Sequence, residues 1–191
     1  MISEIAIFSD MSNLQRKAIF IFCLMLFAQG LSAQEPVVRR PSPLAIVNTR
    51  YGQTYFKITY SQPHKNGREI FGNVVPYGKV WRTGANEATE LTVTKDIQVN
   101  GTLLPAGTYS LFTIPDKEKW TIIINREVGL WGSYNYNPKL DVMRFEVPVT
   151  ESPGGLVYEP FTIQLIQRNE VADLLLMWDR TRVSIPIKFI Y

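Results

Sequence analysis

Polar side chains that could do chemistry are concentrated in one block of the sequence, residues 82–89, which reads Arg-Thr-Gly-Ala-Asn-Glu-Ala-Thr. The block supplies a guanidinium at Arg82, a carboxamide at Asn86 and a carboxylate at Glu87. Gly84 allows the backbone to approach neighbouring groups closely, because it has no side chain. We expect these side chains to form one polar cluster.

A second charged pair, Arg68 and Glu69, lies upstream on the same irregular segment, residues 61–88, and is expected to join the cluster. Two interpretations remain open. In the first, the cluster is a pocket in which the arginines bind a carboxylate or phosphate, while Asn86 and Glu87 orient hydroxyl or amide groups. In the second, the charges pair with one another and satisfy the backbone groups of a long loop.

A glycan or peptide hydrolase is the enzymatic alternative to a binding domain. Glu69 or Glu87 would act as general base beside Arg82, since two carboxyls about 5–10 Å apart can support glycoside hydrolysis. His64, the only histidine, is expected to be a solvated loop residue, because no second histidine, cysteine or acidic cluster accompanies it. No complete catalytic set is visible, and we expect neither a metal nor a cofactor.

Aromatic side chains alternate with Gly, Ser and Asn in a second unusual segment, residues 129–138. Trp131 and Tyr134 could form a stacking platform for sugar rings, because flat π faces pair with the C–H faces of pyranoses. The alternative is that these aromatics fold back and close one end of the core. Three other tryptophans lie in or beside apolar segments and are predicted to be core residues: Trp81, Trp120 and Trp178.

The elements that position these residues are predicted to be strands, because apolar residues recur with period two. In Tyr55–Tyr60, alternate side chains point to opposite faces, as in a half-buried strand. Asn100-Gly101 predicts a hairpin with a type I′ turn. No helix longer than about two turns is expected after residue 43. The fold class is therefore all-β, a single antiparallel β-sandwich or jelly roll of about eight to ten strands.

The amino terminus has the order of a secretory signal peptide. The pair Arg16-Lys17 precedes an apolar run over residues 18–28, and small residues follow as far as Ala33, after which we predict cleavage. Met11 is the expected true start, because the residues before it add acidic groups that are unusual in such a segment. The apolar run has 11 residues, fewer than the roughly 20 that a membrane span needs.

The expected organisation is a signal peptide over residues 1–33, an extended Pro-rich leader over 34–43 and one domain over 44–191. The mature chain would be periplasmic or secreted. The only cysteine, Cys23, lies within the signal peptide, so disulfides and thiol chemistry are excluded from the mature chain.

Composition limits the partners. The chain has 191 residues, 46% of them hydrophobic, which suits one globular domain with an apolar core. Its net charge of +3 comes from scattered basic residues, so no nucleic-acid partner is expected. A small polar or glycan ligand is the expected partner, and no membrane span is expected in the mature chain.

Four segments resemble the family called domain of unknown function 2911: residues 67–72, 75–89, 105–112 and 120–125. The similarity extends from about residue 42 to 187, and Trp-Arg-Thr-Gly-Ala-Asn-Glu is its most specific block. The resemblance implies an exported, β-rich protein of Bacteroidota whose biochemical role is unassigned, and it supplies no catalytic residues. A ligand-binding or envelope-associated protein is therefore the favoured interpretation.

Overall fold

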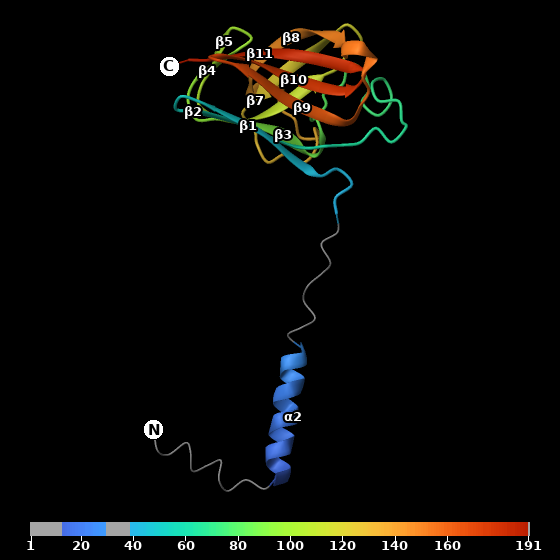
Figure 1. Ribbon diagram of the computed structural model, residues 1–191, viewed down its shortest axis with the longest axis vertical. Helices are drawn as coiled ribbons and strands as arrows, with labels where there is room; N and C mark the ends of the chain where they lie inside the picture. Colours follow the sequence, from blue (N-terminus) through green and yellow to red (C-terminus); the bar gives the residue numbers. More distant parts are fainter. Residues whose placement is uncertain (1–12, 30–38, 191) are drawn as a thin grey trace. The chain divides into compact units, whose positions relative to one another are not determined.

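The computed structural model describes residues 13–29 and 39–190, in two compact units, residues 1–39 and 40–191. In the first unit, helix α2 (Asn13–Gln29) contains the apolar run of the predicted signal peptide (Figure 1). None of the described helices has the length and apolar character needed to span a membrane. The predicted cleavage site after Ala33 and residues 34–38 of the leader lie outside the described residues.

The second unit is a single antiparallel sheet folded into two layers. Its strands are β1 (Leu44–Tyr51), β2 (Thr54–Ser61), β3 (Ala85–Val93), β4 (Ile97–Val99), β5 (Thr102–Leu104), β6 (Gly107–Ile114), β7 (Lys119–Asn125), β8 (Asp141–Glu151), β9 (Tyr158–Arg168), β10 (Val171–Asp179) and β11 (Thr181–Phe189). They follow the order β1-β2-β3-β6-β7-β8-β11-β10-β9, and the β4–β5 hairpin pairs with β11. The predicted all-β antiparallel sandwich is confirmed, with eleven strands rather than eight to ten.

Strand β8 connects the two layers. Its first part, from Asp141 to Pro148, pairs with β7, and its last part, from Val149 to Glu151, pairs with β11. The main core lies between the layers. In β2, for example, Phe56, Ile58 and Tyr60 are buried in alternation with half-exposed residues, as the period-two pattern predicts.

Aromatic rings fill one end of this core. Trp81 stacks on Trp178, with ring centroids 5.9 Å apart and planes 17° apart. Trp120 meets Trp81 edge-on at 6.0 Å, and Phe71 and Phe161 also contact Trp81. The prediction that the three tryptophans are core residues is confirmed, because each is at most 7% exposed.

A second, smaller core lies on the outer face of β3, β6 and β7, where residues 126–140 cover the sheet. Phe112 and Ile123 are buried there, and Tyr136 packs on Phe112 with ring centroids 5.1 Å apart. The Tyr136 hydroxyl donates to Asp141 at 2.7 Å. Burial and then this hydrogen bond raise the pKa of Tyr136 to about 12. The network ties the covering segment to the start of β8.

Two strands differ from the sequence predictions. β1 was not predicted, because its exposed side begins with the apolar residues Leu44 and Ile46, so no alternation is visible at its start. β3 begins at Ala85, within the predicted loop, because its first residues are polar and Asn86 has a φ of 56°.

The local turn predictions are confirmed. Asn100 and Gly101 both have positive φ, 49° and 76°, as a type I′ turn requires. After residue 43, the described chain contains only two helices, both three-residue 3-10 turns, η1 (Pro138–Leu140) and η2 (Pro153–Gly155).

Candidate functional site

The conspicuous block from Trp81 to Thr89 folds back on itself. The Trp81 indole donates to the Gly84 carbonyl at 3.0 Å, and the Thr89 hydroxyl donates to the Thr83 carbonyl at 2.6 Å. Thr83 has a φ of 56°, which is rare for a β-branched residue. A Cβ at Gly84 would lie 2.9 Å from the Ser61 carbonyl oxygen, so this position requires glycine. The block is thus held in one unusual conformation by buried contacts.

Glu87 projects from this block and pairs with the leader. One carboxylate oxygen accepts from the Arg40 guanidinium at 2.7 Å, and the other accepts from the Ser61 hydroxyl at 3.3 Å. The Glu87 side chain is 42% exposed. A hydrogen bond from its own backbone N–H, followed by the contacts with Arg40 and Ser61, holds its pKa below the ordinary value. Glu87 is therefore an ionised, accessible hydrogen-bond acceptor at neutral pH.

Asn86 also contacts the leader, since its amide donates to the Ser42 carbonyl at 3.5 Å. Residues 40–43 consequently lie against the start of β3. No pattern in the sequence indicates these partners, because Arg40 belongs to a short Pro-rich segment that is expected to be solvated.

Of the two open interpretations, the one in which Arg68, Glu69, Arg82 and Glu87 pair with one another is wrong. Arg68 is exposed and donates instead to the backbone carbonyls of His64 and Lys65, at 2.6 and 3.0 Å. Glu69 is also exposed, and the ion pairs of the described residues include none formed by Arg68, Glu69 or Arg82. The physical reason is that Arg68, Glu69 and Glu87 keep contact with water, so no burial cost drives them together.

Arg82 is half-buried beside the aromatic segment. Its Nε is buried and has no partner in the described part of the chain. A Cβ at Gly132 would lie 3.8 Å from Nη1 of Arg82 and 2.8 Å from the Tyr134 ring. Gly132 also has a φ of 70°, so glycine is required on both counts. Arg82 and Tyr134 therefore both lie against the backbone of Gly132.

The aromatic segment is placed beside Glu87 by two main-chain hydrogen bonds. Ala88 donates to the Leu130 carbonyl at 2.8 Å, and the Gly132 N–H donates to the Asn86 carbonyl at 2.9 Å. Trp131 is consequently paired with Glu87 as its direct neighbour in an antiparallel bridge. Side chains of directly opposite residues project from the same face, so the indole and the carboxylate lie side by side.

Two aromatic side chains of this segment are open to solvent, Trp131 at 61% and Tyr134 at 84% exposure. Only Tyr136 folds back onto a core, against Phe112. Each of the two interpretations therefore holds for part of the segment. Tyr136 closes a core, whereas Trp131 and Tyr134 are accessible. We call the resulting surface the Glu87–Trp131 face, formed by Arg40, Arg82, Asn86, Glu87, Trp131 and Tyr134.

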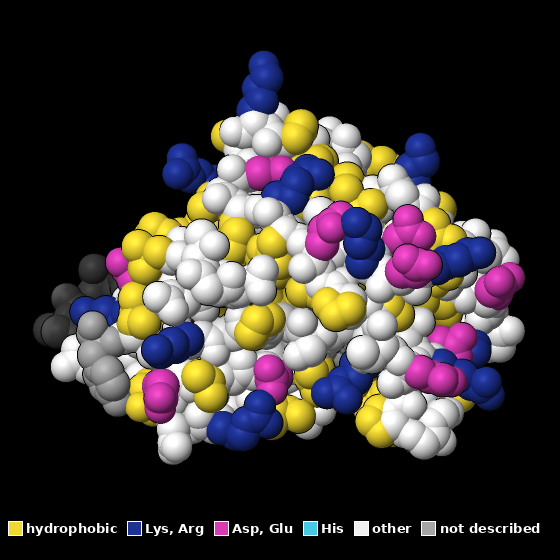
Figure 2. Space-filling view, turned by 90° about the horizontal axis from the view of Figure 1, so that it is seen from above, with side chains coloured by type: hydrophobic (Ala, Val, Ile, Leu, Met, Phe, Trp, Pro, Cys, Tyr) yellow, Lys and Arg dark blue, Asp and Glu magenta, His cyan; other side chains and the backbone are white. Residues whose placement is uncertain are grey.

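The polar groups of this face are the side chains of Arg40, Arg82, Asn86 and Glu87. Glu87 contacts a guanidinium and a hydroxyl, and Glu69 lies on a separate exposed turn. Within residues 13–29 and 39–190, no three or more His, Cys, Asp or Glu residues are grouped so that they could hold a metal ion. Basic and acidic side chains are interspersed over the surface seen in Figure 2, without a large region of one sign.

A protein-family model matches most of the chain. The model described as protein of unknown function, DUF2911, matches residues 42–187. The chain belongs to the DUF2911 family. No curated protein and no solved structure matches it. The DUF2911 match includes every residue of the Glu87–Trp131 face except Arg40, which precedes it.

Proposed function

We propose that this DUF2911 domain is a non-enzymatic glycan-binding protein and that the Glu87–Trp131 face is its binding surface. The observation that supports this most strongly is the exposure of Trp131 and Tyr134, 61% and 84%, on a segment held in place by main-chain hydrogen bonds. Accessible aromatic rings on an ordered segment are typical of interaction sites, because solvent contact with large apolar groups is unfavourable.

The polar groups beside the rings suit hydroxyl-rich ligands. A pyranose stacked on Trp131 would place its hydroxyls near Glu87, whose ionised carboxylate accepts O–H donors. Arg82 adds a half-buried guanidinium, whose Nη1 lies near Gly132 beside Tyr134. The left-handed backbone of Thr83 and Asn86 is a further indication, since strained residues cluster at functional sites.

Binding is favoured over hydrolysis because a glycosidase needs two carboxyls with different roles. One is a general acid with a raised pKa, and the other is an ionised carboxylate about 5–10 Å away. The pKa of Glu87 is lowered, first by its own backbone N–H and then by Arg40 and Ser61, so Glu87 could only be the ionised member, and a separate general acid would be required. Neither of the hydrogen-bonded partners of its carboxylate is an acid.

Tryptophan fluorescence offers a direct test, because Trp131 is exposed whereas the other three tryptophans are buried. Titration with soluble hexose and N-acetylhexosamine oligosaccharides should shift the emission and protect it from acrylamide quenching. Trp131→Phe should remove the signal but keep binding measurable by calorimetry, and Trp131→Ala should abolish both. Leu156→Ala, which truncates an exposed apolar side chain elsewhere, is the control. Unchanged affinity in Trp131→Ala would contradict the proposal.

Export is the second part of the proposal, and it rests on the basic pair Arg16-Lys17 followed by the apolar part of α2. The mature protein should begin at Gln34. Intact-mass measurement of protein recovered from the cell envelope and the medium tests this. A mass that retains residues 11–33 would contradict signal-peptide cleavage while leaving the glycan test unaffected.

A further inference from the structure

A cavity of about 820 Å³ lies at the end of the sandwich remote from the Glu87–Trp131 face. Its walls come from four places: the turn after Tyr51, the connection after β3 with Lys95 and Asp96, the β5–β6 turn at Ala106, and Ile190 after β11. Small-molecule sites in proteins usually occupy about 300–1,000 Å³. The cavity is therefore large enough for a ligand of several carbon atoms.

The apolar wall of the cavity is fixed to the main core. Tyr51 stacks on Phe189, with ring centroids 5.6 Å apart, and Phe189 meets Phe56 edge-on at 6.3 Å. Phe189 and Phe56 are at most 1% exposed. Because these rings are packed on one side, the Tyr51 wall cannot fill the cavity without disturbing the core.

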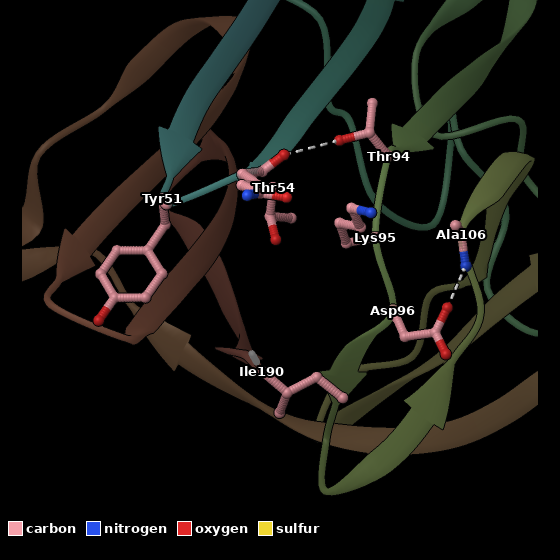
Figure 3. A pocket seen from close by; sticks show the side chains of 9 residues that line it. Tyr51, Thr54, Thr94, Lys95, Asp96, Ala106 and Ile190 are labelled. Atoms are coloured by element: carbon pink, nitrogen blue, oxygen red, sulfur yellow. Dashed lines mark hydrogen bonds between the residues drawn. The ribbon is translucent and has the colours of Figure 1, made fainter.

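Two charged side chains line the cavity, and only one has a partner among the described residues. The Asp96 carboxylate accepts the Ala106 N–H at 2.8 Å and so closes the β5–β6 turn. Lys95 takes part in none of the ion pairs or side-chain hydrogen bonds found over residues 39–190. Figure 3 shows Lys95 between Thr94 and Asp96, across the opening from Tyr51 and Ile190.

We propose that this cavity binds a carboxylate with an aliphatic tail, in which Lys95 pairs with the carboxylate and the Tyr51–Ile190 side contacts the tail. Lys95 is the only cation among the lining residues and selects an anion, whereas Asp96 keeps its charge but is directed to the Ala106 N–H (Figure 3). The largely apolar wall selects a tail over a second polar group. This site is independent of the proposed glycan surface.

Octanoate is a suitable probe, and matched molecules separate the two halves of the interaction. 1-Octanol keeps the tail without the charge, octylammonium reverses the charge, and acetate keeps only the head group. Calorimetry should give binding in the order octanoate, 1-octanol, and then no detectable binding for the other two. Amide chemical shifts of Thr94 and Ala106 should move on addition of octanoate, which identifies the cavity as the site.

Lys95→Gln should weaken octanoate binding about tenfold or more, as expected for a lost charged hydrogen bond, and should leave 1-octanol binding unchanged. Lys117→Gln, which removes an exposed charge at the other end of the domain, is the control. Equal octanoate affinity in Lys95→Gln, equal affinity of the wild type for octanoate and 1-octanol, no binding at millimolar octanoate, or shifts confined to Trp131 and Tyr134 would each overturn the proposal.

Discussion

The two ends of the sandwich differ in whether the connections between strands cover the space between the layers. At one end, residues 62–84 join β2 to β3 and return Phe71 and Trp81 to the space between the layers. At the other, the connections are the short segments 52–53, 94–96 and 105–106, which do not cover the gap. Figure 1 shows the long connection at the end opposite β4 and β5. The length of the connections thus decides which end is filled with rings and which holds a cavity.

Trp81→Ala should have the largest effect on this difference. It removes a ring that contacts Trp178, Trp120 and Phe161, and we expect a loss of about 3–5 kcal/mol in the free energy of unfolding. Urea denaturation followed by circular dichroism measures it. The matched control Trp131→Ala truncates an exposed tryptophan and should change stability by at most about 0.5 kcal/mol. A loss in Trp81→Ala as small as that expected for Trp131→Ala would show that the aromatic end does not stabilise the fold.

One tyrosine hydroxyl at each end forms a hydrogen bond, and the contributions of the two bonds to stability can be compared. Tyr60 at the filled end accepts the buried N–H of Ile163 at 3.1 Å, so Tyr60→Phe leaves a buried donor unpaired and should cost about 1–3 kcal/mol. Tyr109 at the open end donates to the carbonyl of exposed Pro105 at 2.9 Å, where water can replace it. Tyr109→Phe should therefore cost less. Chemical denaturation of both variants decides the order, and a larger loss in Tyr109→Phe would reverse the comparison.

The leader contact at the filled end should contribute about 0.2–1 kcal/mol, because Arg40 and Glu87 are 56% and 42% exposed. The folded pKa of Glu87 is lowered, so its contribution is fully present above its ordinary pKa of 4.5 and disappears as the pH falls through the folded value. Arg40→Gln should therefore have a lower free energy of unfolding than the wild type at pH 7. This difference should become smaller at high salt, which screens the ion pair. A difference that persists at pH 2 would exclude an ionic contact.

The smallest effect is expected at the open end. Lys95→Gln removes an exposed side chain without a described partner, so the free energy of unfolding should change by at most about 0.5 kcal/mol. Thermal and urea unfolding in the absence of ligand measure it. A loss of several kcal/mol would mean that Lys95 belongs to the structural core of that end.

Local sequence patterns predicted the strands and turns whose formation depends on neighbouring residues. The alternation in Tyr55–Tyr60 fixed a strand, and Asn100-Gly101 fixed a hairpin, because period and positive φ are readable over a few residues. Of the candidate site, the residue types were identified but not their partners. Arg40 and Glu87 are 47 positions apart, and nothing in the sequence indicates that the leader returns to β3.

The cavity could not be predicted at all. It is lined by residues from separate segments, among them Tyr51, Lys95 and Ile190, and none belongs to a recognisable motif. The cavity is the space that the short turns leave open at this end, and that space exists only in the assembled sandwich.

The position of β11 has a consequence for the order of folding. This strand lies inside the sheet: Thr181 pairs with Glu151 of β8, Ile187 with Val99 of β4, and residues 181–188 with β10. Hairpins such as β1–β2 or β6–β7 can form from nearby residues, whereas the β4–β11 pairing must close a long loop first. The two layers can therefore join completely only when residues 181–189 are in place, so a chain shortened before β11 should leave both the cavity wall and the edge of β8 unformed.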